Sequence, residues 1–143
     1  RKREVKLEPL FAEFDGLEPR ERLELLIEFS DSLPDLSDPR SGEPAPRECR
    51  VLECQTAVDL WVDVIEGRVW LEAAVPRQSP TIRGLVALLV EGINGSRVDE
   101  GLQMPDDVLG PLGLADTLGM TRQRGSRGLV AAIKRRTVAA ETT

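Results

Sequence analysis

The sequence predicts an α+β fold in which a small antiparallel β-sheet, built around a central hairpin, is covered by several α-helices. Residues 57–75 alternate apolar and polar side chains on both sides of a Glu66-Gly67 turn, which is the pattern of a β-hairpin. The segments before and after the hairpin repeat apolar residues at helical spacing. Because a hairpin alone is marginally stable, we expect these helices to cover its apolar face.

Two helices and a loop are expected before the hairpin. The first helix is short, over about residues 7–14. The second begins at Pro19, which suits the first turn of a helix because the N–H that proline lacks would have no partner there, and it runs to about residue 33. Residues 34–46 are rich in Pro, Asp, Ser and Gly, so we expect a loop that wraps the body.

The register of the hairpin follows from its alternation. Pairing Val64 with Val69 places every second residue of both strands on one face, and a slip of one residue would break this match. The same register sets Trp61 opposite Glu72 on the other face, which also carries Trp70. That face is either partly exposed or covered by a helix. The residues expected on the apolar face are Val58, Leu60, Val62, Val64, Val69, Leu71, Ala73 and Val75.

The sequence after the hairpin predicts a mostly buried helix over residues 81–93, which Asn94-Gly95-Ser96 ends. The last helix is expected to begin after Met120-Thr121. Its inward residues are predicted to be Leu129, Val130 and Ile133.

Two local features are left open by the sequence. Pro105-Asp106-Asp107 can start a short helix, which Gly110-Pro111 interrupts before residues 112–118. The sheet either has the two hairpin strands alone or gains a third short strand, over residues 50–53 or over residues 97–102.

Length and composition suit one domain over residues 1–143, since 41% hydrophobic content can fill one core. Charges interrupt every apolar stretch well before the roughly 20 residues of a membrane helix, and the N-terminus lacks the apolar segment of a secretion signal. We therefore expect a cytoplasmic protein that does not associate with membranes.

Charge is uneven along the chain. Residues 1–118 carry 24 acidic and 13 basic side chains, a net charge of −11, whereas residues 119–143 carry 1 acidic and 6 basic, a net charge of +5. The overall negative charge and the 3% aromatic content argue against nucleic acid as a partner. Two features of the basic segment, residues 119–143, are left open. Its three arginines near the start either hold an anion or are solvated: Arg122, Arg124 and Arg127. The segment as a whole either docks on an acidic protein or is a solvated helix.

Cysteine is nearly the only nucleophile that the chain offers. There is no histidine, so Ser-His and Cys-His pairs are excluded, and two cysteines cannot complete a four-ligand Cys/His zinc site. Cys54 lies between Glu53 and Gln55, which do not suit an apolar interior. A lone cysteine can attack sulfur once it is a thiolate. The alternatives for Cys54 are persulfide relay, redox sensing, or a structural role as a small core residue.

The second cysteine, Cys49, lies five residues before Cys54. At ~3.3 Å per residue an extended segment would hold the two roughly 16 Å apart, so a disulfide requires a tight loop. Cys49 is either structural or a resolving thiol, and a thiol redox sensor that uses Cys49 and Cys54 is one hypothesis for function. A noncatalytic adaptor that binds through the basic last helix is another.

Five short motifs stand in a distinctive order and spacing. They are Cys54-Gln55-Thr56 before the first strand, the Gly67 hairpin, Ile82-Arg83-Gly84-Leu85 at the start of an apolar helix, Leu112-Gly113-Leu114, and Arg122-Gln123-Arg124-Gly125 before the last helix. Together they resemble the SufE family of sulfur-acceptor proteins over nearly the whole chain. The resemblance implies a compact α+β domain, with Cys54 in the place of the persulfide-carrying cysteine.

The resemblance also implies a reaction and its partners. A SufS-like, pyridoxal phosphate-dependent cysteine desulfurase would hold sulfur as a persulfide, and Cys54 would carry it to a SufBCD-like iron-sulfur scaffold while stimulating the desulfurase. The pyridoxal phosphate belongs to the partner, so we expect no cofactor and no metal in this chain. The resemblance therefore implies that the protein is an accessory protein of the desulfurase and not a stand-alone enzyme. The residues implied to support the site or the docking are Gln55, Thr56, Arg83 and Arg122.

Overall fold

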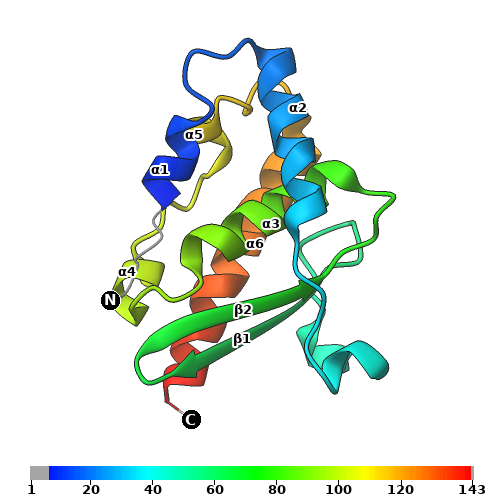
Figure 1. Ribbon diagram of the computed structural model, residues 1–143, viewed down its shortest axis with the longest axis vertical. Helices are drawn as coiled ribbons and strands as arrows, with labels where there is room; N and C mark the ends of the chain where they lie inside the picture. Colours follow the sequence, from blue (N-terminus) through cyan, green and yellow to red (C-terminus); the bar gives the residue numbers. More distant parts are fainter. Residues whose placement is uncertain (1–6, 143) are drawn as a thin grey trace.

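Figure 1 shows the computed structural model of this protein, which describes residues 7–142. A two-stranded antiparallel sheet lies at one end of the molecule, with strand β1 over Asp59–Ile65 and strand β2 over Arg68–Ala74. Two long helices, α3 (Pro80–Ile93) and α6 (Gly119–Glu141), pack against the sheet. The predicted α+β class, a small hairpin sheet with helical cover, is confirmed.

Residues 7–142 contain four shorter α-helices as well, of which α1 and α5 lie away from the sheet, whereas α2 ends near it (Figure 1). The two helices predicted before the hairpin are present, although the second ends in a 3-10 turn after Phe29. The prediction of one domain over residues 1–143 stays a prediction. The bounds are α1 Leu7–Ala12, α2 Pro19–Phe29, α4 Val98–Leu102 and α5 Leu109–Leu112, with 3-10 helices over Ser30–Ser32, Arg40–Gly42 and Arg47–Cys49.

The predicted register of the hairpin is confirmed. Val64 lies opposite Val69, and Trp61 lies opposite Glu72. Glu66 and Gly67, the two residues of the turn, have positive φ angles of 53° and 76°, which is the geometry of a type I′ turn and matches the twist of the strands. The alternation of side chains and the local turn therefore specify the same pairing.

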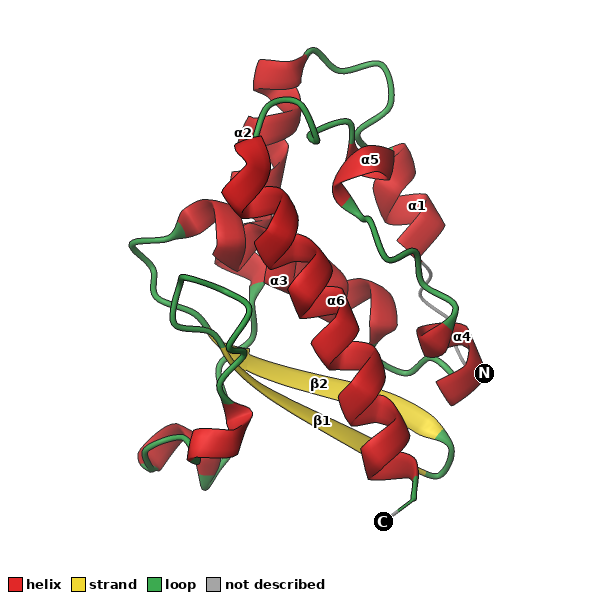
Figure 2. Ribbon diagram, turned by 180° about the vertical axis from the view of Figure 1, so that it is seen from behind, coloured by secondary structure: helices red, strands yellow, loops and turns green. Residues whose placement is uncertain are grey.

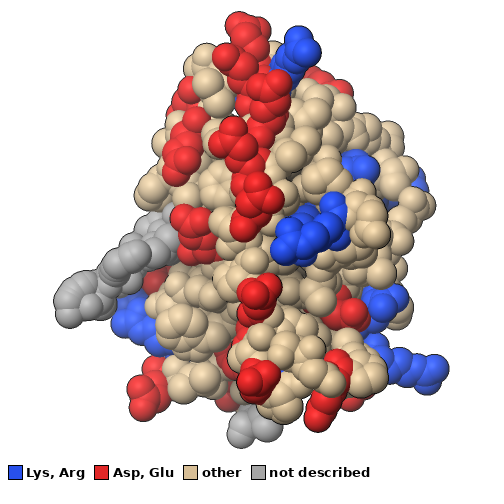
Figure 3. Space-filling model, turned by 45° about the vertical axis from the view of Figure 1, so that its right-hand side comes forward, with Lys and Arg blue, Asp and Glu red and all other residues tan. Residues whose placement is uncertain are grey.

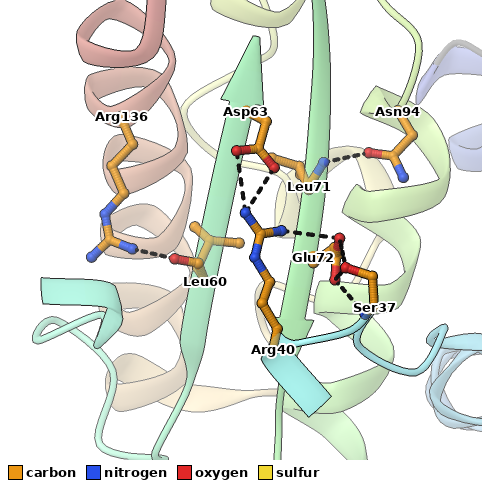
Figure 4. Close-up of polar contacts among 8 residues, drawn as sticks. All are labelled: Ser37, Arg40, Leu60, Asp63, Leu71, Glu72, Asn94 and Arg136. Atoms are coloured by element: carbon orange, nitrogen blue, oxygen red, sulfur yellow. Dashed lines mark hydrogen bonds and ion pairs between the residues drawn. The ribbon is translucent and has the colours of Figure 1, made fainter. Parts of the chain in front are cut away.

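The face of the hairpin that carries Trp61, Trp70 and Glu72 is partly covered by the loop over residues 34–46. Trp70 remains 42% exposed, so the alternative of a partly exposed face is the one that the structure shows. The Arg40 guanidinium donates to the carboxylates of Asp63 and Glu72, at 3.1 and 3.0 Å, and lies 5.5 Å from the Trp61 ring centroid (Figure 4). Burial raises the pKa of the Glu72 carboxyl, but its hydrogen bonds from Ser37 and Arg40 outweigh this effect and lower the pKa below its usual range.

The edges of the hairpin are also fixed by side chains from the helical layer. The Asn94 Oδ1 atom accepts a hydrogen bond from the Leu71 N–H at 2.7 Å on the β2 edge. On the β1 edge the Arg136 Nη1 atom donates to the Leu60 carbonyl oxygen at 2.9 Å (Figure 4). Asn94 follows α3 directly and Arg136 is part of α6, so these bonds hold the hairpin against both long helices.

Within the described residues the sheet has the two hairpin strands alone, so a third strand forms neither over residues 50–53 nor over residues 97–102. Arg50 and Arg97 each form a single bridge, with Asp59 and Arg68 respectively. The chain then turns into α4, because the Glu100 carboxylate accepts a hydrogen bond from the Arg97 N–H at 2.9 Å and so caps the start of a helix.

The predicted interruption at Gly110-Pro111 is wrong as well, since both residues lie within α5. Pro111 is tolerated because the N–H groups of a first helical turn have no intrahelical partner. The Asp107 carboxylate accepts hydrogen bonds from the N–H groups at the start of this helix, and Gly113, with a φ of 72°, ends it.

Helix α3 forms the centre of the core, with 11 of its 14 residues buried. On one side α2 lies so close that a Cβ atom added to Gly84 would overlap the carbonyl oxygen of Leu26. On the other side lies α6, which begins at Gly119, slightly earlier than predicted. Its three residues predicted to face inward, Leu129, Val130 and Ile133, are all buried. None of the helices within residues 7–142 combines the length and the apolar character needed to cross a membrane.

Candidate functional site

Cys54 lies in the loop between the 3-10 helix Arg47–Cys49 and β1, and Figure 2 shows this loop beside α3 and α6. The loop is a tight turn, since the Cys54 N–H donates to the Val51 carbonyl at 3.3 Å and the Val51 N–H donates to the Val58 carbonyl at 2.9 Å. The Cys54 Sγ atom lies 3.7 Å from the carbonyl oxygen of Gly125 in α6, which accepts a hydrogen bond from the thiol. Cys54 is half-buried in this position.

The thiol faces a small cavity of about 100 Å³ between the loop, the start of α3 and the start of α6. Larger hollows exist elsewhere on the molecule, but neither cysteine lines them. The cavity brings together four of the five residues that the sequence singled out: Cys54, Gln55, Thr56 and Arg122. Its other lining residues, Ile82, Thr121 and Gly125, complete the wall.

The surroundings of Cys54 favour the neutral thiol. Burial raises the pKa of Cys54, and the nearby Glu53 carboxylate raises it further. Arg122 is exposed at the cavity and forms no hydrogen bond or ion pair within residues 7–142, so its guanidinium is available to an anion. The site at rest therefore holds a weakly nucleophilic sulfur in a cavity whose wall also includes an arginine.

The second cysteine lies in a different environment. Cys49 is only 9% exposed, and burial raises the pKa of its thiol. Its carbonyl oxygen accepts a hydrogen bond from Arg136, which also binds the carbonyl oxygens of Arg50 and Leu60, each at 2.9 Å. Both cysteines are free thiols. Nothing in the sequence pattern pointed to Arg136, although it fixes the start of the loop that carries Cys54.

Arg83 is the predicted site residue that does not line the cavity. Its side chain is 9% exposed and donates to the carbonyl oxygens of Ser30, at 3.0 Å from Nε, and Val75, at 2.6 Å from Nη1. Arg83 thereby joins the start of α3 to the ends of α2 and β2, and the neighbouring Ile82 is the residue that reaches the cavity. That Arg83 supports the site stays a prediction. Its contacts mean that such support would act through the position of α3 and not through contact with the cavity.

We expect Arg83→Met to lower the free energy of unfolding by about 2–3 kcal/mol, because it leaves two buried carbonyl groups without their charged donor. Arg77→Met is the matched control, since Arg77 is exposed in the link before α3, and its expected effect is within about 0.5 kcal/mol. Urea denaturation of the two variants and the wild type measures both values. Equal stabilities for Arg83→Met and the wild type would contradict the structural role.

The basic segment that begins at residue 119 is largely paired with the acidic body. Lys134 binds Asp106 at 2.8 Å, and Arg135 contacts Glu53 at 3.5 Å. Arg127 is held near Asp107, at 3.7 Å, so the three arginines at the start of α6 do not act as one anion site. On the face in Figure 3, acidic side chains form a band over the upper part of the molecule, whereas basic ones are scattered, with one group near the middle and several toward the right-hand edge. No group of three or more His, Cys, Asp or Glu side chains suited to a metal ion occurs among residues 7–142.

The chain is similar to several known proteins. A family model described as "SufE: Fe-S metabolism associated domain" matches residues 8–137. Two uncharacterized SufE-like proteins from strains of Mycobacterium tuberculosis are each 35% identical over 130 residues, 88% of this chain and 85% of theirs. The chloroplastic quinolinate synthase of Nicotiana tabacum is 32% identical over 117 residues, which are 81% of this chain but 16% of that protein. The solution structure of a hypothetical protein from Thermus thermophilus has a TM-score of 0.81 at 27% identity, and the match covers 99% of this chain and 100% of that chain.

Proposed function

This chain belongs to the SufE family, whose domain is associated with Fe-S metabolism, and from that membership we propose that it accepts sulfur on Cys54 from a cysteine desulfurase. The observation that carries the proposal is the position of Cys54. Of the two thiols, Cys54 is the one that lines the small cavity, and the wall of the same cavity includes Arg122, which has no ion-pair partner among the described residues. The resemblance of the motifs supports the same role for Cys54.

The proposed reaction is a thiol exchange at sulfur. The Cys54 thiolate attacks the outer sulfur of a persulfide on the desulfurase, a new S–S bond forms at Cys54 Sγ, and the bond to the desulfurase sulfur breaks. The desulfurase cysteine leaves as a thiolate, so the reaction needs no oxidant and no catalytic base in this chain. A second exchange of the same kind passes the sulfur to an acceptor thiol for iron-sulfur cluster assembly.

The resting site has to change before this reaction can proceed. Burial keeps the Cys54 thiol neutral by raising its pKa, and its hydrogen bond to the Gly125 carbonyl turns the sulfur toward α6. We infer that docking draws the loop outward, where the thiol ionises more readily, and that Arg122 stabilises the resulting anion. Pyridoxal phosphate, which strips sulfur from free cysteine, is the partner's cofactor in this scheme.

The test is the transfer of sulfur to Cys54. The purified protein is incubated with a cysteine desulfurase and cysteine, without reductant, and examined by intact mass and peptide mapping. We expect a gain of ~32 Da that maps to Cys54, the mass of one added sulfur. A loss of about 2 Da that maps to a bridge between Cys49 and Cys54, with no added sulfur, would favour the redox-sensor hypothesis instead.

A further inference from the structure

The loop that carries Cys54 is anchored in the core at both of its ends. Val51 and Val58 are each 0% exposed, whereas Leu52 between them is 85% exposed. Leu52 therefore adds no apolar burial, and within the middle of the loop Cys54 packs only partly against the core. The middle of the loop contacts α6 through Cys54 and through the residue before it, Glu53.

The contact made by Glu53 depends on a glycine. A Cβ atom added to Gly128 of α6 would overlap the Cβ atom of Glu53, so the stem of Glu53 lies directly on the backbone of the helix. The carboxylate of Glu53 then reaches Arg135, where the Oε2 and Nη2 atoms are 3.5 Å apart. Gly125, which accepts the hydrogen bond from Cys54, lies one turn before Gly128, so the three contacts share one stripe of α6.

We propose that Glu53 is a positioning residue that holds the Cys54 loop in its sequestered position, through its stem on Gly128 and its carboxylate at Arg135. Release of Glu53 from α6 is then the step that exposes the thiol. The inference rests on the proposed sulfur-acceptor function for its purpose, because a thiol that must enter a desulfurase needs a loop that can open. The experiment that tests the role of Glu53 measures alkylation of Cys54 and needs no desulfurase, so its result does not depend on the proposed function.

The charged groups around the thiol restrict the alternatives. Glu53 lies on the loop itself, Arg122 lines the same cavity from α6, and α3 contributes the apolar Ile82. Removing Glu53 could therefore speed the reactions of Cys54 in two ways, by opening the loop or by removing a neighbouring negative charge. The dependence of rate on pH separates the two effects.

The experiment measures the rate at which iodoacetamide alkylates Cys54 in the purified protein, followed by peptide mapping, which separates Cys54 from the buried Cys49. We expect Glu53→Ala to raise the rate about tenfold, because the loop opens more often. Arg135→Gln removes the ion-pair partner but leaves the packing, so the expected increase is smaller, at most about fivefold. Gly128→Ala leaves both charges in place but displaces the stem of Glu53, and it should also raise the rate.

Glu48→Ala is the control, since Glu48 is an exposed carboxylate on the 3-10 helix just before the loop, and its rate should stay within about twofold of the wild type. If the loop opens, the rate for Glu53→Ala exceeds that of the wild type by the same factor at every pH from about 7 to about 11, a range that extends above the usual pKa of a thiol, because the reagent meets the open thiol in both proteins.

Two results would overturn the proposal. One is a rate for Glu53→Ala within about twofold of the wild type. The other is an increase that disappears as the pH rises, since this would mean that Glu53 acts through its charge alone. Neither result depends on a desulfurase, so a failure of sulfur loading on the wild type would count against the proposed function and not against the role of Glu53.

Discussion

Replacing Cys54 with serine is expected to abolish the stimulation of a cognate cysteine desulfurase, with a fall of at least about 100-fold in the added turnover. A serine hydroxyl is not ionised near neutral pH, and it cannot hold sulfur as a persulfide. The measurement is the rate of sulfide release from cysteine, in the presence of reductant, with the desulfurase alone and with each form of this protein added.

Cys49→Ala is the matched control for the loss of a thiol. Cys49 is buried and does not line the cavity, so this variant should keep most of the stimulation while losing some stability, as expected for a small buried side chain. Undiminished stimulation by Cys54→Ser would contradict the proposed chemistry and would favour a noncatalytic adaptor. If Cys49→Ala loses the stimulation as Cys54→Ser does, the reaction uses both thiols.

Replacing Gly84 with alanine is expected to lower the free energy of unfolding by about 2 kcal/mol or more net. The added methyl group would overlap the carbonyl oxygen of Leu26, and a backbone atom cannot rotate away as a side chain can. Helices α2 and α3 must then separate within a densely packed core, which typically costs about 1–3 kcal/mol or more, against a gain of at most about 1 kcal/mol from the better helix propensity of alanine. Thermal and urea denaturation measure the difference.

Gly125→Ala is the control for this substitution. Gly125 lies within α6, and a Cβ atom added there has nothing within 4 Å apart from the helix's own backbone and its chain neighbours. The variant should therefore be more stable than the wild type by about 0.5–1 kcal/mol, because alanine reduces the freedom of the unfolded chain. A Gly84→Ala variant as stable as Gly125→Ala would show that the two helices do not pack as closely as described.

The elements with a strong local pattern were predictable from the sequence. Residues 57–75 specify the hairpin, because a period of two and a tight turn both act between near neighbours. Helix α3 was equally clear, since its apolar residues extend over several turns. The short helices α4 and α5 were missed or misplaced, because each is decided by one capping carboxylate, Glu100 or Asp107, and not by a periodic pattern.

For the candidate site, too, one part was predictable from the sequence and another part was not. The absence of histidine and the presence of two cysteines narrowed the candidate nucleophiles, but the polar neighbours of Cys54 and the resemblance of its motif to the SufE family were needed to favour it over Cys49. The residues that surround the thiol were not predictable to the same extent. Gly125 is 71 residues away along the chain, and Gly128 matters because it lacks a side chain where Glu53 has to lie.

The sequence by itself thus determined the fold class and the register of the hairpin, and it supplied Cys54 as the candidate for the reactive residue. The tertiary structure alone decided that Arg83 ties α3 to its neighbours instead of lining the cavity, and that Glu53 lies on α6. The physical reason is the range of the interactions. Periodicity, turns and residue chemistry are properties of neighbouring residues, whereas burial, close backbone contacts and the raised pKa of Cys54 arise only when distant segments pack together.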